Sequence, residues 1–269
     1  MSSAHTIGFS ADRLQGELRT SRFGRAAEVV AETASTIELA WGLLRGGGPE
    51  GAVVIAERQT QGRGRLGRPW ASPAGGLWLS MIARPDMEAS AAGRLGIGLG
   101  LAAAEAVMAE TGCDAGVKWP NDVMVSGRKL GGVLVETEVT GDRVTGAVLS
   151  LGLNVNVSAA ALPEEIRSTA TSLREQTGRE WPVEVICARV LERLEEMWPI
   201  VLGNGAALVE RWGARDVLAG KEVSLEVRGV MVRGRAEGLD SDGGLRLSVA
   251  GAVQRVTSGE VAEIRGVAA

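Results

Sequence analysis

The 269-residue sequence is poor in the side chains that most often carry catalysis, with one histidine, two cysteines and no tyrosine. The single histidine, His5, stands in the N-terminal segment, which argues against Ser-His-Asp triads and histidine-rich metal sites. Cys113 and Cys187 are far apart and lack metal-ligand spacing, so we expect reduced thiols. The chemistry of this chain must therefore rest on other groups.

Long hydrophobic runs are also missing, and this absence bears on location. We expect no apolar run to reach the length of a membrane span, and the first residues have no signal-peptide core. The sequence thus predicts a cytoplasmic protein with no membrane partner. A formal net charge of −4 argues against a surface that coats nucleic acid. With 45% hydrophobic residues, the chain can bury a substantial core.

The stretch Gln59–Trp70 holds three glycines and three arginines between two apolar runs, 52–56 and 77–82. The runs are typical of strands, so the stretch is predicted to be the loop between them. Glycines let backbone N–H groups turn toward an anion, and arginines offer forked donors to carboxylate or phosphate. From this stretch alone, a mobile anion-binding loop, a solvated basic hairpin tip and a nucleic-acid contact all stay open.

Hydrophobic periodicity predicts an α+β fold. Strands are expected at 26–32, 52–56, 77–82, 116–119, 123–125, 129–136 and 143–151, and helices at 10–19, 35–45, 88–111, 182–202 and 206–214. Several strands follow one another through short turns, which indicates a mixed, mostly antiparallel sheet with helices.

The composition changes after Gly220. Short strands are expected at 222–227, 230–239, 244–249 and 252–257, separated by turns. Such a series favours a small β-barrel. We therefore expect a catalytic domain over residues 1–219 and a small β domain over residues 220–269.

Four separated segments then form one ordered pattern: Gly62–Trp70, Lys118–Asp122 (KWPND), Lys129–Glu136 (KLGGVLVE) and Gly152–Asn156 (GLNVN). Together they resemble the biotin–protein ligases, which join biotin to a lysine of a biotin carboxyl-carrier protein. The resemblance runs from about Leu18 to the C-terminus. Too few residues precede it for a winged helix, so the chain is similar to the short members that lack this DNA-binding domain.

The resemblance implies a fold and a reaction. The fold would be a class II synthetase-like catalytic domain with an SH3-like C-terminal barrel. ATP and biotin would give biotinyl-5′-adenylate and pyrophosphate, with Mg²⁺ arriving on the ATP phosphates. A lysine of the carrier, from acetyl-CoA carboxylase or another biotin-dependent carboxylase, would then displace AMP. No nucleic-acid partner is expected, and exposed strand edges would permit a homodimer.

The resemblance also implies a biotin site. Its residues would be Ser35, Thr36, Gln59, Arg63, Gly64, Arg65 and Lys129. The first three would hydrogen-bond the ureido ring, since each unpaired buried polar group costs about 1–3 kcal/mol. Ser35 and Thr36 are equally good helix N-caps, and their spacing alone favours that role. The family usually has asparagine where this chain has Ile37, so one ureido contact would be missing or rebuilt.

The nucleotide and the chemistry would use an overlapping set. Nucleotide contacts would come from Arg63, Arg65, Trp70, Asn121 and Asn154, and catalysis from Lys129, Arg63, Arg65 and Asp122. Trp70 would be a ledge for adenine, with core filling as the alternative. Asn121 and Asp122 are also good turn residues. No metal ligand is singled out, because Mg²⁺ can bind mainly through ATP phosphates.

Two other functions remain open. One is a lipoyl- or octanoyl-transferring relative on the same fold, although such enzymes lack this Arg/Gly loop. The other is a non-catalytic biotin-sensing or nucleic-acid-binding regulator, which only the arginine cluster favours.

Overall fold

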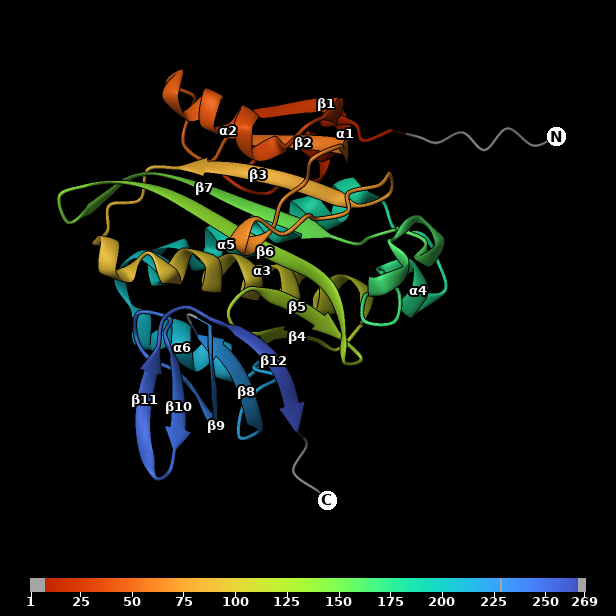
Figure 1. Ribbon diagram of the computed structural model, residues 1–269. Coiled ribbons are helices and arrows are strands. Elements are labelled where there is room, and N and C mark those ends of the chain that lie inside the picture. Colours follow the sequence, from red (N-terminus) through yellow and green to blue (C-terminus); the bar gives the residue numbers. More distant parts are fainter. Residues whose placement is uncertain (1–7, 228, 266–269) are drawn as a thin grey trace.

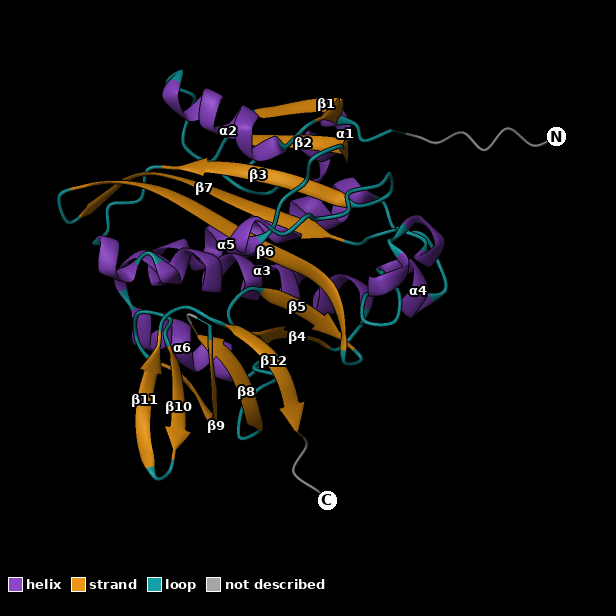
Figure 2. Cartoon of the chain, viewed as in Figure 1, coloured by secondary structure: helices purple, strands orange, loops and turns teal. Residues whose placement is uncertain are grey.

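The computed structural model describes residues 8–227 and 229–265, so His5 lies outside the described residues. It is a mixed α+β fold, which confirms the expected class (Figure 2). Its large sheet has the strand order β1-β2-β3-β7-β6-β5-β4. The strands are β1 (Ala27–Thr33), β2 (Val53–Gln59), β3 (Leu77–Ala83), β4 (Ala115–Lys118), β5 (Asp122–Val125), β6 (Arg128–Thr140) and β7 (Arg143–Leu153). All neighbours are antiparallel except the β1–β2 pair at one edge.

Helices cover both faces of this sheet (Figure 1). They are α1 (Ala11–Glu17), α2 (Thr36–Arg45), α3 (Gly93–Thr111), α4 (Leu173–Thr177), α5 (Val183–Gly203) and α6 (Gly205–Gly213). Ser10 and Ser35 cap α1 and α2 by accepting hydrogen bonds from backbone N–H groups, as their positions predict. The short helix α4 was not predicted, because five residues are too few to show a helical period.

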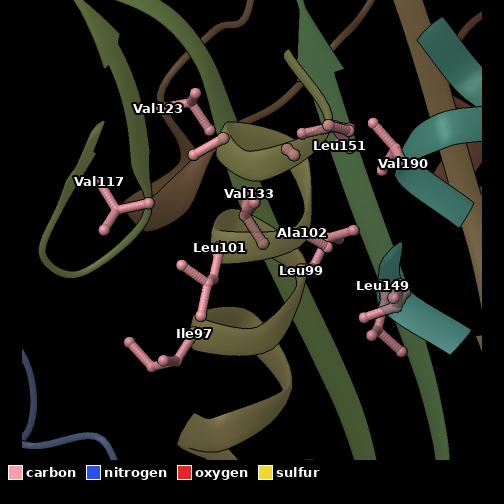
Figure 3. Packing of buried hydrophobic residues seen from close by; sticks show 14 of the residues in the cluster. Ile97, Leu99, Leu101, Ala102, Val117, Val123, Val133, Leu149, Leu151 and Val190 are labelled. Carbon is pink, nitrogen blue, oxygen red and sulfur yellow. The ribbon is translucent and has the colours of Figure 1, made fainter. Parts of the chain in front are cut away.

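The main core lies between the sheet and the helices α3 and α5. Figure 3 shows Leu99 and Leu101 of α3 among Val133, Leu149 and Leu151 of strands β6 and β7. Small residues on α3 let it approach its neighbours closely, and each buried aliphatic side chain contributes about 1.5–3 kcal/mol. On the other face, α2 packs over a smaller cluster, and the rest of that face stays open for a site.

One expectation about apolar runs was wrong. The segment Ala89–Thr111 has 23 residues and is long and apolar enough to cross a membrane by length and composition. In this fold 67% of its most apolar window is buried, and α3 forms the centre of the core. Its apolar character is thus explained by its packing in the protein core.

The C-terminal part forms a second, antiparallel sheet with the order β11-β10-β9-β8-β12. Its strands are β8 (Glu222–Val227), β9 (Val230–Leu239), β10 (Leu245–Val249), β11 (Ala252–Val256) and β12 (Glu260–Arg265). The first four were predicted and β12 was not. The loop between β9 and β10 docks on the large domain, because Trp119 Nε1 donates to Gly243 O at 3.0 Å and Arg94 Nε donates to Ser241 O at 2.8 Å. Closure of this sheet into an SH3-like barrel stays a prediction.

Candidate functional site

A cavity of about 260 Å³ lies between the Arg/Gly loop, the open face of the large sheet and strand β12. Ten of the predicted residues line it: Thr36, Gln59, Arg63, Gly64, Arg65, Trp70, Asn121, Asp122, Lys129 and Asn154. Ser35 is not among the described residues that line the cavity; it is buried and its hydroxyl caps α2. Side chains separated by more than a hundred residues in sequence thus meet around one space.

One end of the cavity, here called the neutral end, is lined by Thr36, Gln59 and Ser150, with the buried Ser80 behind them. Gln59 Oε1 accepts from Thr36 N at 2.8 Å and from Thr36 Oγ1 at 3.2 Å. The Thr36 hydroxyl lies 2.7 Å from Ser80 Oγ, which lies 2.8 Å from Ser150 Oγ. A continuous chain of uncharged hydrogen bonds therefore runs from the loop into the sheet.

Next to the neutral end, alternate residues of β7 form the wall of the cavity on the side of the sheet, here called the floor. Val148, Ser150, Gly152 and Asn154 follow at intervals of two, so their side chains share one face where the strand is regular. Val148 belongs to the cluster under α2, whereas the next three positions line the cavity. The strand face thus changes from apolar packing to polar cavity floor within a few residues.

Trp70 lies flat on that floor. A Cβ built at Gly152 would lie 2.5 Å from Trp70 Nε1, and one built at Gly132 would lie 3.2 Å from Trp70 Cζ3. A side chain at Gly152 would collide with the indole, and one at Gly132 would be tighter than ordinary contact, so both glycines make room for Trp70. Lys129 Nζ is 5.1 Å from the centre of the ring, within cation–π range. Trp70 Nε1 is buried without a partner among the described residues.

The opposite end, here called the charged end, consists of Arg65, Lys118, Asn121, Asp122 and Lys129. The Asp122 carboxylate is buried and receives Lys129 Nζ at 2.6 Å and Lys118 Nζ at 3.1 Å. The sequence has three lysines, and two of them meet here. Strands β4, β5 and β6 place these groups, since Lys118 pairs with Asp122 across one hairpin and Lys129 follows the next.

Arg65 completes the charged end. Its Nη1 donates to Asn121 Oδ1 at 3.3 Å and to Gly259 O at 3.2 Å. Burial lowers the pKa of Arg65, and the carboxylates of Asp122 and Glu260 act in the opposite direction. A guanidinium held in this way keeps further donors for an anion.

The other two loop arginines face carboxylates. Arg63 forms ion pairs with Glu38 at 2.7 Å and with Glu136 at 3.3 Å, and Arg68 pairs with Glu260. The loop is braced by isolated bridges, one of which joins Arg63 to Pro69. Arg63 could bind a substrate anion in two ways. Its guanidinium would have to leave the two glutamates for that anion, or its backbone N–H would have to bind the anion in place of the guanidinium.

The two asparagines are held by the backbone of the sheet. Asn121 Nδ2 donates to Val133 O at 3.2 Å, and Asn154 Nδ2 donates to Thr171 O at 2.9 Å. Asn154 Oδ1 is buried without a partner among the described residues. A buried acceptor without a partner costs about 1–3 kcal/mol, so this oxygen would gain from a ligand donor.

Sequence reasoning missed several residues of the site. Ser80 and Ser150 stand inside apolar strands, and an isolated hydroxyl within such a run was the available signal. Lys118 belongs to the KWPND segment and was given no role. Glu260 and Val261 come from β12, nearly two hundred residues after the loop, and no local pattern links them to it.

Among residues 8–227 and 229–265, no group of three or more His, Cys, Asp or Glu side chains is arranged to hold a metal ion. The carboxylates that line the cavity, Asp122 and Glu260, are engaged by lysines and arginine. Mg²⁺ needs only one or two carboxylates when substrate phosphates supply other ligands. A magnesium ion that arrives with a nucleotide would therefore be held mainly by the phosphates.

Two family models match the chain. The biotin/lipoate A/B protein ligase family matches residues 29–156, and the biotin protein ligase C-terminal domain matches residues 219–262. The first match contains the loop, both ends of the cavity and the floor strand, and the second contains most of the small sheet.

Relatives match over most of the chain. The biotin–[acetyl-CoA-carboxylase] ligase of Mycobacterium tuberculosis is 36% identical and covers 90% of each chain. The bifunctional ligase/repressor BirA of Bacillus subtilis is 28% identical over 94% of this chain and 82% of that protein. The solved biotin protein ligase from Aquifex aeolicus in complex with biotin and ATP is 31% identical, with a TM-score of 0.75 over 90% of this chain and 99% of that one.

Proposed function

The chain belongs to the biotin/lipoate A/B protein ligase family and is an ATP-dependent biotin ligase, and we propose that its cavity holds biotin at the neutral end and the nucleotide at the charged end. The observation that carries this proposal is the cavity itself. Uncharged hydrogen-bonding groups and a cation cluster meet on one floor at opposite ends, and biotin has a neutral ureido ring at one end and a carboxylate at the other. The two ends of biotin thus correspond to the two ends of the cavity.

Binding would begin with the ureido ring beside Gln59 and Thr36. These groups already form hydrogen bonds with one another, so they are oriented before biotin arrives. Ser35 would act through α2, which it caps, and so position Thr36. The backbone N–H of Arg63 would cover the ring from the loop side, and Gly64, whose own N–H donates to Arg68 O at 2.8 Å, would line it. Preorganised partners lower the cost of desolvating a neutral polar ring.

Adenylation would take place at the charged end. One biotin carboxylate oxygen attacks the α-phosphorus of ATP, the bond to the β-phosphate oxygen breaks, and pyrophosphate leaves. Two ammonium groups and one carboxylate leave a net positive charge on the Lys118–Asp122–Lys129 cluster. Lys129 would stabilise the charge that builds between carboxylate and phosphate, and Arg65 would bind the α-phosphate. Mg²⁺ bound to the phosphates would neutralise the leaving pyrophosphate.

Transfer would use the same geometry. The carrier lysine, as a neutral amine, attacks the acyl carbon of the adenylate, an amide bond forms and AMP leaves with the bonding electrons. Asp122 would receive or orient the amine proton, a role that the position of its buried carboxylate within the charged end supports. Trp70, Asn121 and Asn154 would contact the nucleotide, and the loop would keep water from the anhydride.

We also propose the partner and the location. A biotin carboxyl-carrier domain is the protein substrate, which the relatives named as acetyl-CoA-carboxylase ligases support. A cytoplasmic location agrees with the free cysteines, and the loop arginines that already face carboxylates favour a protein without a nucleic-acid partner. The absence of a membrane partner stays a prediction. A catalytic unit over residues 1–219 and a small unit over 220–269 agree with the start of the second sheet at Glu222. A homodimer stays a prediction.

Mass spectrometry can test the proposed function directly. The purified chain is incubated with ATP, Mg²⁺, biotin and an apo carrier domain, and a lysine of the carrier should gain one biotinyl group. A carrier whose target lysine is replaced by arginine is the control. Lipoate in place of biotin tests the acyl-transferring alternative. Modification with lipoate and none with biotin would overturn the proposal.

A further inference from the structure

Ser150 ends the hydrogen-bond chain of the neutral end, and neither the family motifs nor the sequence pattern assigns it a role. It lies in the middle of β7, opposite Ser80 of β3, and it lines the cavity. Ser80 itself is fully buried and does not line the cavity in the described part of the chain. We infer that Ser150 contacts biotin and determines specificity by accepting a hydrogen bond from a ureido N–H. This inference rests on the proposed function.

The direction of the chain is fixed at Gln59. Thr36 N donates to Gln59 Oε1 at 2.8 Å, and Gln59 Nε2 donates to Ser72 Oγ at 2.8 Å. The Ser72 hydroxyl in turn donates to Trp70 O at 3.2 Å, so its oxygen must accept from Gln59. If the Gln59 side-chain amide were flipped, its NH₂ group would face the N–H of Thr36, and two donors would meet. The amide oxygen therefore faces Thr36.

A fixed acceptor at one end orients the hydroxyls behind it. Thr36 Oγ1 donates to Gln59 Oε1, which leaves the Thr36 oxygen as an acceptor for Ser80. The Ser80 oxygen then accepts from Ser150. Because the Ser150 hydroxyl donates its hydrogen to Ser80, its oxygen lone pairs are free to accept a hydrogen bond from a ligand in the cavity. In a chain of hydroxyls each bond polarises the next, which strengthens the last acceptor.

A ureido ring needs such an acceptor. It carries two N–H donors and one carbonyl, and each donor left without a partner costs about 1–3 kcal/mol. Gln59 Oε1 already accepts two hydrogen bonds from Thr36. Ile37, the next residue of α2, lines the cavity but has no polar side-chain atom. On the β7 face, Val148 and Gly152 on either side of Ser150 offer no side-chain acceptor either.

Ligands that lack one donor can test this contact. We would measure, by calorimetry, the binding of biotin and of two analogues, each with one ureido N–H replaced by CH₂. For Ser150→Ala we expect biotin affinity to fall about fivefold, the size of one neutral hydrogen bond. Binding of the analogue that lacks the N–H facing Ser150 should not change. Equal losses for biotin and both analogues, or no loss at all, would overturn the inference.

Controls separate a contact from a general effect on the fold. Ser224→Ala removes an equally buried serine from β8, outside the cavity, and should leave biotin binding unchanged. The ATP affinity of Ser150→Ala should match that of the unaltered chain, and its thermal midpoint, which falls with the lost hydrogen bond to Ser80, should still lie well above the temperature of the titrations. If the alanine variant does not fold, Ser150→Cys keeps the volume and weakens the acceptor, and the same selective loss is expected.

The outcome is also distinct from that of the proposed function. An unaltered chain that biotinylates the carrier, together with a Ser150→Ala variant that keeps full preference for biotin over both analogues, refutes only the inference. An unaltered chain that binds no biotin refutes the proposed function. A loss confined to biotin and one analogue supports both.

Discussion

The two ends of the cavity bind in different ways. The neutral end holds its polar groups in a continuous chain of uncharged hydrogen bonds that forms before any ligand arrives and ends at Ser150. The charged end holds two ammonium groups on one carboxylate and a guanidinium on an amide and a carbonyl. A chain of neutral hydrogen bonds gives selectivity, because a ligand that leaves a buried donor or acceptor unpaired binds more weakly. Charged groups instead increase affinity by an amount that depends on geometry and on salt concentration. Substitutions can show whether the two ends act separately.

The largest effect is expected at the centre of the charged end. Lys129→Ala should slow pyrophosphate release by about 10²–10³-fold, because one electrostatic contact is lost from the transition state. Biotin affinity should fall much less. Stopped-flow detection of pyrophosphate and calorimetry provide the two measurements. Lys221→Ala is the matched control, and a Lys129→Ala variant with unchanged pyrophosphate release would remove Lys129 from the mechanism.

A smaller effect is expected when the guanidinium of the loop is removed. Arg65→Ala should raise the dissociation rate of the adenylate by about 10–100-fold, since hydrogen bonds to charged groups contribute about 1.5–3 kcal/mol. Biotin alone should bind almost as well as before. Retention of radiolabelled adenylate after gel filtration measures the first quantity. Equal losses for biotin and adenylate would mean that Arg65 does not distinguish the two ends.

The neutral end should show the opposite selectivity. Thr36→Val keeps the shape of the side chain but breaks the hydroxyl chain, so biotin affinity should fall about tenfold. ATP affinity should stay the same, and the loss should not depend on salt. Titrations in low and high potassium chloride test both points. Thr137→Val on β6 is the control, and a salt-dependent loss would show that the two ends are coupled.

The smallest effect is expected from the loop that docks the small sheet beside Trp119. Burial raises the pKa of Asp240, but hydrogen bonds from Arg255 and from the N–H groups of Gly244 and Asp242 outweigh it, so this pKa lies below its ordinary value. The carboxylate therefore stabilises the fold above the unfolded pKa of about 3.9, and this stabilisation is lost as pH falls through the folded value.

Asp240→Asn should lower the thermal midpoint at neutral pH by about 2–4 °C, and the difference should shrink in acid. ATP affinity should fall slightly, while biotin affinity should not change. Calorimetric melts across the acid range provide the test, with Asp142→Asn in an exposed turn as control. A difference that grows as the pH falls would contradict the assigned role of the carboxylate.

The ends also differ in how far the sequence predicted them. Lys129, Asp122 and Arg65 stood in recognisable segments, and the strands between them followed from periodicity. Ser80 and Ser150 could not be singled out, because pairing across β3 and β7 is a long-range property. The carboxylates that hold Arg63 and Arg68 come from α2, β6 and β12, so no local pattern showed those pairings. Local sequence patterns thus predicted the helices and strands, whereas the contacts between their side chains depend on tertiary packing.

The scarcity of lysine limits the groups of this enzyme that an acyl adenylate could modify. An acyl adenylate reacts with amines, and this protein makes one while carrying two lysines at the reaction site and one elsewhere, Lys221. Both cavity lysines are ion-paired with Asp122, and a lysine in an ion pair has no free lone pair with which to attack. The surface is otherwise supplied with arginine, which is a very poor nucleophile. A carrier lysine that enters as a free amine is therefore the favoured acceptor.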